Sequence, residues 1–142
     1  RIFPDRTLEA LNLILQAFPN EIRIVLSSTW RVDCTAQEDI LYDFRAYGRP
    51  PLAQITDFYD VTDPSFHSIR QHEIYRFVQQ HSDRISAWIA LDDEALTGSS
   101  SELQTRSAAF EGHSILCESS VGLTEPQAHQ AVALLQEQLA RR

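Results

Sequence analysis

The sequence has no apolar run near the roughly 20 residues that a membrane-spanning helix requires, and its first residues do not read as a signal peptide. We therefore expect a soluble, cytoplasmic protein with no membrane partner. The chain also opens on Arg1 rather than Met, which indicates that upstream sequence has been lost or trimmed.

Cysteine and positive charge are both scarce. The two cysteines, Cys34 and Cys117, lie far apart with no CxxC or Cys/His spacing, which argues against a zinc site and favours reduced thiols. The formal net charge of -8 disfavours a broad nucleic-acid-binding surface, which needs a basic footprint, but leaves room for a local basic pocket. With 142 residues, 43% of them hydrophobic, the chain can form one domain with a real core.

The stretch from Ile22 to Arg31, IRIVLSSTWR, is an apolar run that ends in three hydroxyl residues, an aromatic residue and a base. Its β-branched start predicts a strand covered on both faces. In an open parallel sheet ligands bind where such strands end. Ser27, Ser28 and Thr29 are therefore candidates to donate hydrogen bonds to phosphate oxygens. The alternative is a plain turn, in which these hydroxyls satisfy local backbone groups.

Helical and strand patterns alternate along the chain. We expect helices over 7–18, 35–47, from between 64 and 68 to about 80, and 124–139, strands over 22–26, 52–55, 87–91 and 113–117, and a loop over 57–65. This order favours an α/β fold, a doubly wound Rossmann-like parallel sheet with helices on both faces. Such a domain normally starts on a strand, so the first helix looks like half of a crossover whose strand is absent.

Local signals mark the ends of two of these helices. TAQE at Thr35–Glu38 and TEPQ at Thr124–Gln127 match the capping box, in which the first and fourth residues satisfy each other's free amide groups. They predict the starts of the second and last helices. Gly48 predicts the end of the second helix.

Arg70 is an unusual residue for its position. It lies one turn before Ile74 on the inward face of the third helix, where burial costs it hydration and the helix dipole opposes a positive charge. One interpretation is that it extends to the surface or pairs with a carboxylate such as Asp92. The other is that it faces a phosphate.

The strand over 87–91 ends in three consecutive acids, Asp92, Asp93 and Glu94. Oxygen ligands of this kind suit Mg²⁺, which commonly takes one or two carboxylates, several waters and a substrate phosphate. The alternative is a solvated acidic turn.

Together these segments resemble a known superfamily. The order of an IVLSSTWR segment, Arg70 in RQHEI, and a WIALDDE segment is similar to that of the haloacid dehalogenase (HAD) superfamily, most closely the HAD-like domain of the Swiss Army Knife RNA repair proteins. Gly122–Thr124, which opens the last helix, also matches. The resemblance covers residues 7–139, and the combined motifs are far more specific than any single one. It implies a HAD-like fold that lacks its first central strand.

The resemblance assigns a role to each candidate residue. It implies that Ser27 is the phosphate-binding hydroxyl, with Ser28 as a close competitor, and that Arg70 is the base that stabilises charge. It implies that Asp92 and Asp93 hold Mg²⁺ as a cofactor. The expected partner is a phosphorylated substrate, with a nucleotide or an RNA end as one class.

Four residues would contact that substrate: Ser28, Thr29, Trp30 and Arg31. Trp30 could stack on a base and Arg31 could pair with a second phosphate. The alternative for Trp30 is a hydrophobic lid over the crevice. The sequence carries no signal for the oligomeric state.

One motif of the superfamily is missing. DxDGxx on the first strand supplies the aspartate nucleophile and the acid/base aspartate, and no such segment occurs here. Asp5 does not replace it, because nothing strand-like precedes it and no Asp follows two residues later. Two interpretations stay open. In the first, the chain is a single HAD-like domain over 1–142 that belongs to a Mg²⁺-dependent phosphatase and is truncated at its N-terminus. In the second, it is a catalytically inactive module that binds a partner protein or a phosphorylated ligand.

Overall fold

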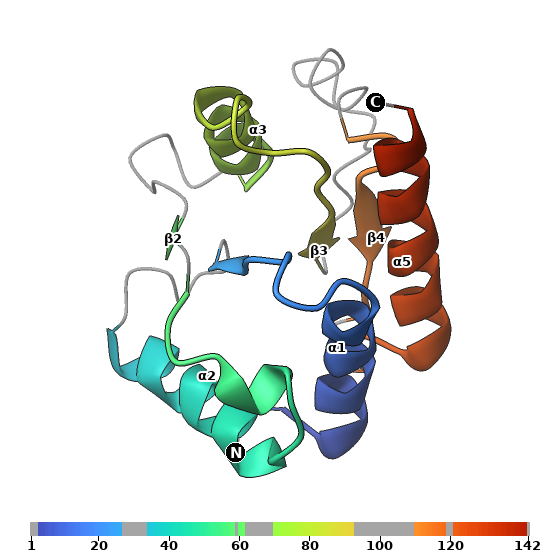
Figure 1. Ribbon diagram of the computed structural model, residues 1–142. Helices are drawn as coiled ribbons and strands as arrows, with labels where there is room; N and C mark the ends of the chain where they lie inside the picture. Colours follow the sequence, from blue (N-terminus) through green and yellow to red (C-terminus); the bar gives the residue numbers. More distant parts are fainter. Residues whose placement is uncertain are drawn as a thin grey trace. The chain divides into compact units, whose positions relative to one another are not determined.

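The computed structural model describes residues 3–26, 34–58, 60–61, 70–92, 110–118 and 121–141. Helices alternate with short parallel strands, which makes the chain an α/β protein (Figure 1). The described elements are α1 (Asp5–Ala17), β1 (Val25–Leu26), α2 (Cys34–Tyr47), η2 (Leu52–Gln54), β2 (Asp60–Val61), α3 (Arg70–Gln80), β3 (Ala90–Asp92), β4 (Ser114–Leu116) and α5 (Glu125–Ala140).

The chain divides into two compact units. The first comprises Arg1–Thr62 and Leu123–His129, and the second comprises Asp63–Gly122 and Gln130–Arg142. Residues of α5 therefore belong to both units. Among the described residues, no helix is both long enough and apolar enough to cross a membrane.

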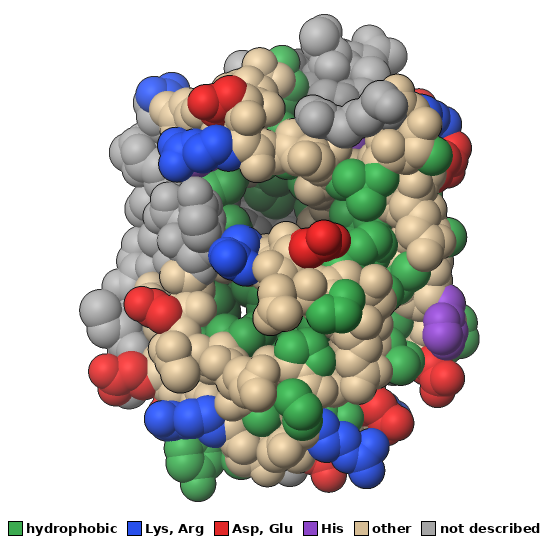
Figure 2. All heavy atoms as spheres, in the orientation of Figure 1, with side chains coloured by type: hydrophobic (Ala, Val, Ile, Leu, Met, Phe, Trp, Pro, Cys, Tyr) green, Lys and Arg blue, Asp and Glu red, His purple; other side chains and the backbone are tan. Residues whose placement is uncertain are grey.

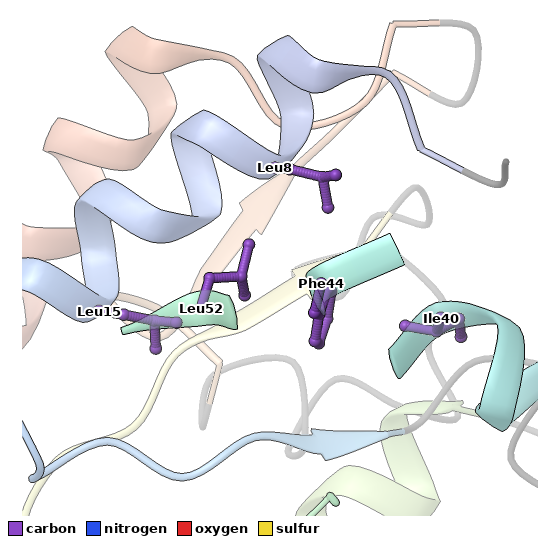
Figure 3. Close-up of a cluster of buried hydrophobic side chains, with 5 residues drawn as sticks. All are labelled: Leu8, Leu15, Ile40, Phe44 and Leu52. Atoms are coloured by element: carbon purple, nitrogen blue, oxygen red, sulfur yellow. The ribbon is translucent and has the colours of Figure 1, made fainter. Parts of the chain in front are cut away.

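The core of the first unit is a cluster of buried aliphatic and aromatic side chains from α1, α2 and η2. Figure 3 shows these side chains converging from the three elements, and they are Leu8, Leu15, Ile40, Phe44 and Leu52. The partly buried Leu26 of β1 packs against the same cluster, together with Ile22 and Ile24 just before the strand. Burial of this apolar surface is the main force that holds β1 against the two helices.

The expected strand over 52–55 is wrong, because this segment forms the short helix η2. The reason is the buried Asn12 of α1, which is 2% exposed. Its side-chain nitrogen donates to the Pro50 carbonyl oxygen at 3.2 Å, and its side-chain oxygen accepts the Leu52 amide at 2.9 Å. The Leu52 amide is therefore hydrogen-bonded to the Asn12 side chain and cannot pair with a neighbouring strand.

We expect Asn12→Ala to lower the free energy of unfolding by about 1–3 kcal/mol, because it leaves the buried Leu52 amide without its acceptor. Urea unfolding followed by circular dichroism measures this loss. Gln16→Ala, on the exposed side of the same helix, is the matched control and should change stability by less than about 0.5 kcal/mol. Equal effects of the two substitutions would contradict this account of η2.

The strand partner of β1 comes instead from a segment that the sequence indicated as a loop. β2 pairs with β1 in parallel, with Val25 beside Asp60 and Leu26 beside Val61. The expected loop over 57–65 is therefore wrong at 60–61, because pairing with β1 decides the conformation of this polar segment. The two strands and the intervening α2 form a parallel crossover of the kind that α/β folds use.

The helix ends agree well with their sequence signals. α2 ends at Tyr47, and Gly48 follows with φ +83°, a conformation that glycine adopts without steric cost. α2 is described from Cys34, one residue before Thr35. The side chain of Thr35 lies outside the described residues, so the first expected capping box stays a prediction. The second is confirmed, since the Thr124 amide donates to Gln127 Oε1 at 3.1 Å and the Gln127 amide donates to Thr124 Oγ1 at 3.4 Å.

The second unit contains α3 and the parallel pair of β3 and β4, which lie side by side in Figure 1. The end of α3 at Gln80 is as expected, and its expected start between 64 and 68 lies outside the described residues. Both strands occur where the apolar runs over 87–91 and 113–117 predict them, in shorter form. The core consists of Ile74, Ala90 and Phe110, with Trp88 edge-on to Phe110 at 5.5 Å between ring centroids.

Candidate functional site

The hydroxyl segment follows directly after the carboxyl end of β1. β1 ends at Leu26 opposite Val61, so the parallel strands β1 and β2 end at the same edge of their sheet. Parallel strands that end together at one edge are the setting in which α/β proteins bind ligands. The candidates themselves lie outside the described residues, and they are Ser27, Ser28, Thr29, Trp30 and Arg31.

The acidic segment begins at the carboxyl end of β3. Asp92 is the last residue of the strand, and its backbone lies beside that of Leu116 at the end of β4. The side chain of Asp92 and the whole of Asp93 lie outside the described residues. After β4 the chain continues to Cys117, which is a half-buried thiol outside any disulfide.

The chain turns back just beyond β4. Glu118 and Gly122 form an antiparallel bridge, and the Gly122 amide donates to the Glu118 carbonyl oxygen at 2.7 Å. Gly122 has φ +81°, the left-handed region that strains other residues. The turn therefore requires a glycine at position 122, and this glycine is also part of the sequence resemblance to the HAD superfamily.

Arg70 is the first residue of α3, and its side chain lies outside the described residues. Three residues later, Glu73 is 2% exposed, so a carboxylate is buried in the first turn of this helix. The helix dipole favours a negative charge there. Glu73 was not among the expected site residues. Its position four residues before Phe77, on one face of the helix, was a signal that could have identified it.

The donor chemistry at the end of β3 fits Mg²⁺. This cation is held by one or two carboxylates and keeps several waters, and the chain supplies Asp92 at the strand end with Asp93 next to it. Within the described residues, no group of three or more His, Cys, Asp or Glu side chains could hold a metal ion. A Mg²⁺ site built on two carboxylates does not need a group of three such side chains.

The second unit also has an open hollow of about 360 Å³, lined in part by Trp88, His113 and Gln138. Trp88 precedes β3 and His113 precedes β4, so the hollow is at the amino ends of these strands. It is therefore separate from the candidate site at the carboxyl ends.

Comparison with known proteins gives one match. A family model described as the HAD domain in Swiss Army Knife RNA repair proteins matches residues 2–128. No curated protein and no solved structure matches the chain. The matched range contains the hydroxyl segment, the start of α3 and the acidic segment after β3.

Proposed function

We propose that this chain, which belongs to the family of HAD domains in Swiss Army Knife RNA repair proteins, is part of a phosphohydrolase. The proposed activity is Mg²⁺-dependent removal of a phosphate group from a nucleotide or an RNA end. The β3–β4 ladder carries this proposal. The ladder is parallel and Asp92 is its last paired residue, so a run of acids starts where the strand ends.

The proposed architecture is a single HAD-like domain with one doubly wound parallel sheet and helices on both faces. The parallel pairings of β1 with β2 and of β3 with β4 support it, because parallel strands joined by helical crossovers are the units of such sheets. In the superfamily the hydroxyl and acidic motifs act on one phosphoryl group, and in this sequence each motif begins at the carboxyl end of one parallel pair.

Each candidate residue has a distinct proposed role. The Ser27 hydroxyl, or that of Ser28, donates to a phosphoryl oxygen. The Arg70 guanidinium offsets the charge that develops on the phosphoryl group. Asp92 and Asp93 hold Mg²⁺, which when bound neutralises phosphate charge so that an anionic nucleophile can approach.

The contacts to the rest of the substrate would come from Thr29, Trp30 and Arg31, with the indole stacking on a base. The chain contains no lysine, so all of its basic side chains, apart from histidine, are arginines, which suit bidentate phosphate contacts. Figure 2 shows arginine and acidic side chains interspersed over the face in view. This distribution favours recognition of a single phosphorylated end over a long nucleic-acid tract.

The aspartate nucleophile has no counterpart in these residues, since the sequence contains no Asp-x-Asp pair. In the superfamily mechanism that aspartate forms an aspartyl-phosphate, which water then hydrolyses. The chain is therefore proposed to supply phosphate and metal binding, with the nucleophile coming from another segment. The second candidate function is a catalytically inactive module that binds a partner protein or a phosphorylated ligand, and the same missing pair favours it.

Binding and turnover assays on the 142-residue chain test these proposals. We expect no hydrolysis of a generic phosphomonoester with Mg²⁺, because the nucleophile is missing. We expect orthophosphate to bind more tightly with Mg²⁺ than without it, and Ser27→Ala to weaken that binding, both measured by titration calorimetry. An orthophosphate affinity that is the same with and without Mg²⁺ would favour the inactive module. Robust turnover that Ser27→Ala abolishes would contradict our account of the nucleophile.

A further inference from the structure

We propose that Gln138 of α5 is a positioning residue that sets the register of β3 against β4 and thereby the backbone position of Asp92, the residue at which the proposed acidic site begins. This inference rests on the proposed function, because it concerns the acids proposed to hold Mg²⁺. Gln138 acts through the strands and does not itself contact the metal.

The Gln138 side chain ties together the segments that precede the two strands. Its oxygen accepts the Trp88 amide at 2.9 Å, and its nitrogen donates to the Trp88 carbonyl oxygen, also at 2.9 Å. The same nitrogen donates to the Gly112 carbonyl oxygen at 3.0 Å. Trp88 lies two residues before β3 and Gly112 lies two residues before β4. One side chain thus holds both strands at their amino ends.

His113 reinforces the same link. Its Nδ1 lies 3.0 Å from the Trp88 carbonyl oxygen, and since a carbonyl only accepts, Nδ1 carries the hydrogen. Its ring stacks on the indole of Trp88 at 4.2 Å with an interplanar angle of 9°. The Ala90 amide donates to the His113 carbonyl oxygen at 2.6 Å, which is the contact immediately before the ladder.

The ladder itself is too short to determine its register alone. β3 and β4 pair over three residues each. A slip of one residue would move the backbone of Asp92 by about 3.3 Å along the strand and would exchange the faces of the sheet that successive residues of β3 occupy. The hydrogen bonds of Gln138 and the stacked ring of His113 resist this slip, because they hold Trp88 and Gly112 at fixed positions before each strand.

Two measurements on the full chain test the inference. We expect Gln138→Ala to weaken Mg²⁺ binding in titration calorimetry by about tenfold, the lower end of the cost of losing a residue that is hydrogen-bonded directly to a metal ligand. We also expect faster hydrogen exchange at the amides of Leu91 and Ile115, which lie opposite each other in the ladder. Both are measured at a temperature where every variant is folded.

Two variants of α5 serve as controls. Gln136→Ala replaces the same residue type at an exposed position and should change neither measurement. Leu135→Val trims a buried side chain that is 7% exposed, so it should lower the melting temperature while the Mg²⁺ affinity stays unchanged. If Gln138→Ala does not fold, Gln138→Glu replaces it, because the carboxylate keeps an acceptor for the Trp88 amide and loses both donor contacts.

The outcomes separate this inference from the proposed function. If Gln138→Ala keeps the Mg²⁺ affinity of the wild type, or if Leu135→Val weakens binding equally, Gln138 is only a stabilising residue and the inference is wrong, whereas the proposed metal site stands. If the wild-type chain binds no Mg²⁺, the proposed metal site is wrong and the inference fails with it.

Discussion

Replacing Asp92 or Asp93 by Asn is expected to weaken Mg²⁺ binding by more than about 100-fold. Loss of a residue that merely supports a metal ligand already costs about 10- to 100-fold in affinity, and these substitutions would remove the charge of a proposed ligand itself. β3 ends at Asp92, and Asp93 follows it in the sequence. Titration calorimetry at fixed ionic strength measures the change.

Asp83→Asn is the matched control, since it removes the same charge from an exposed residue between α3 and β3. It should leave the Mg²⁺ affinity unchanged. A similar loss in this variant would mean that Mg²⁺ responds only to the net charge of the chain. Unchanged affinity in both the Asp92 and the Asp93 variants would exclude the proposed metal site.

Replacing Phe110 by Ala is expected to destabilise the chain by about 3–5 kcal/mol, the usual cost of removing a large buried aromatic side chain. Phe110 is fully buried, and its ring meets Trp88 at an interplanar angle of 84°. Its carbonyl oxygen also accepts the His113 amide at 2.9 Å, in the turn that leads into β4. The truncation would leave a cavity between Ile74 and Ala90, which pack in the same cluster. Urea unfolding followed by circular dichroism measures the loss.

Substitutions of Phe110 that remove different volumes show whether the cavity causes the loss of stability. Phe110→Leu keeps more of the buried volume and should cost less than Phe110→Ala. Tyr42→Ala removes an aromatic ring that is 61% exposed on α2 and should change stability by less than about 0.5 kcal/mol. If Phe110→Ala costs no more than Tyr42→Ala, then Phe110 does not hold the second unit together.

Signals that depend on neighbouring residues in the sequence predicted the structure well. Thr124 and Gln127 form the expected reciprocal cap of α5, and Gly48 follows the last residue of α2. These signals succeed because a cap or a left-handed glycine satisfies groups within the same turn of the chain. The apolar runs before Ser27 and Asp92 likewise predicted the strands that end beside the candidate residues.

Signals that depend on distant residues were missed. The segment over 52–55 has the apolar pattern of a short strand, but Asn12 captures the Leu52 amide, and the two residues are 40 positions apart. Asp60 and Val61 lie in a stretch whose aspartates and proline favour a loop, and they form a strand because β1 pairs with them. Gln138 looked like an ordinary helix residue, although it binds the backbone of Trp88, 50 positions away.

The sequence by itself determined the family of this chain, the positions of most helices, and the fact that hydroxyl and acidic residues follow apolar strands. Only the tertiary structure decided which strands pair, in what register, and which polar side chains hold the strand ends. The physical reason is the range of the interactions. Helix periodicity and caps involve residues within one or two turns, whereas strand pairing and buried hydrogen bonds join groups that are neighbours only after the chain has folded.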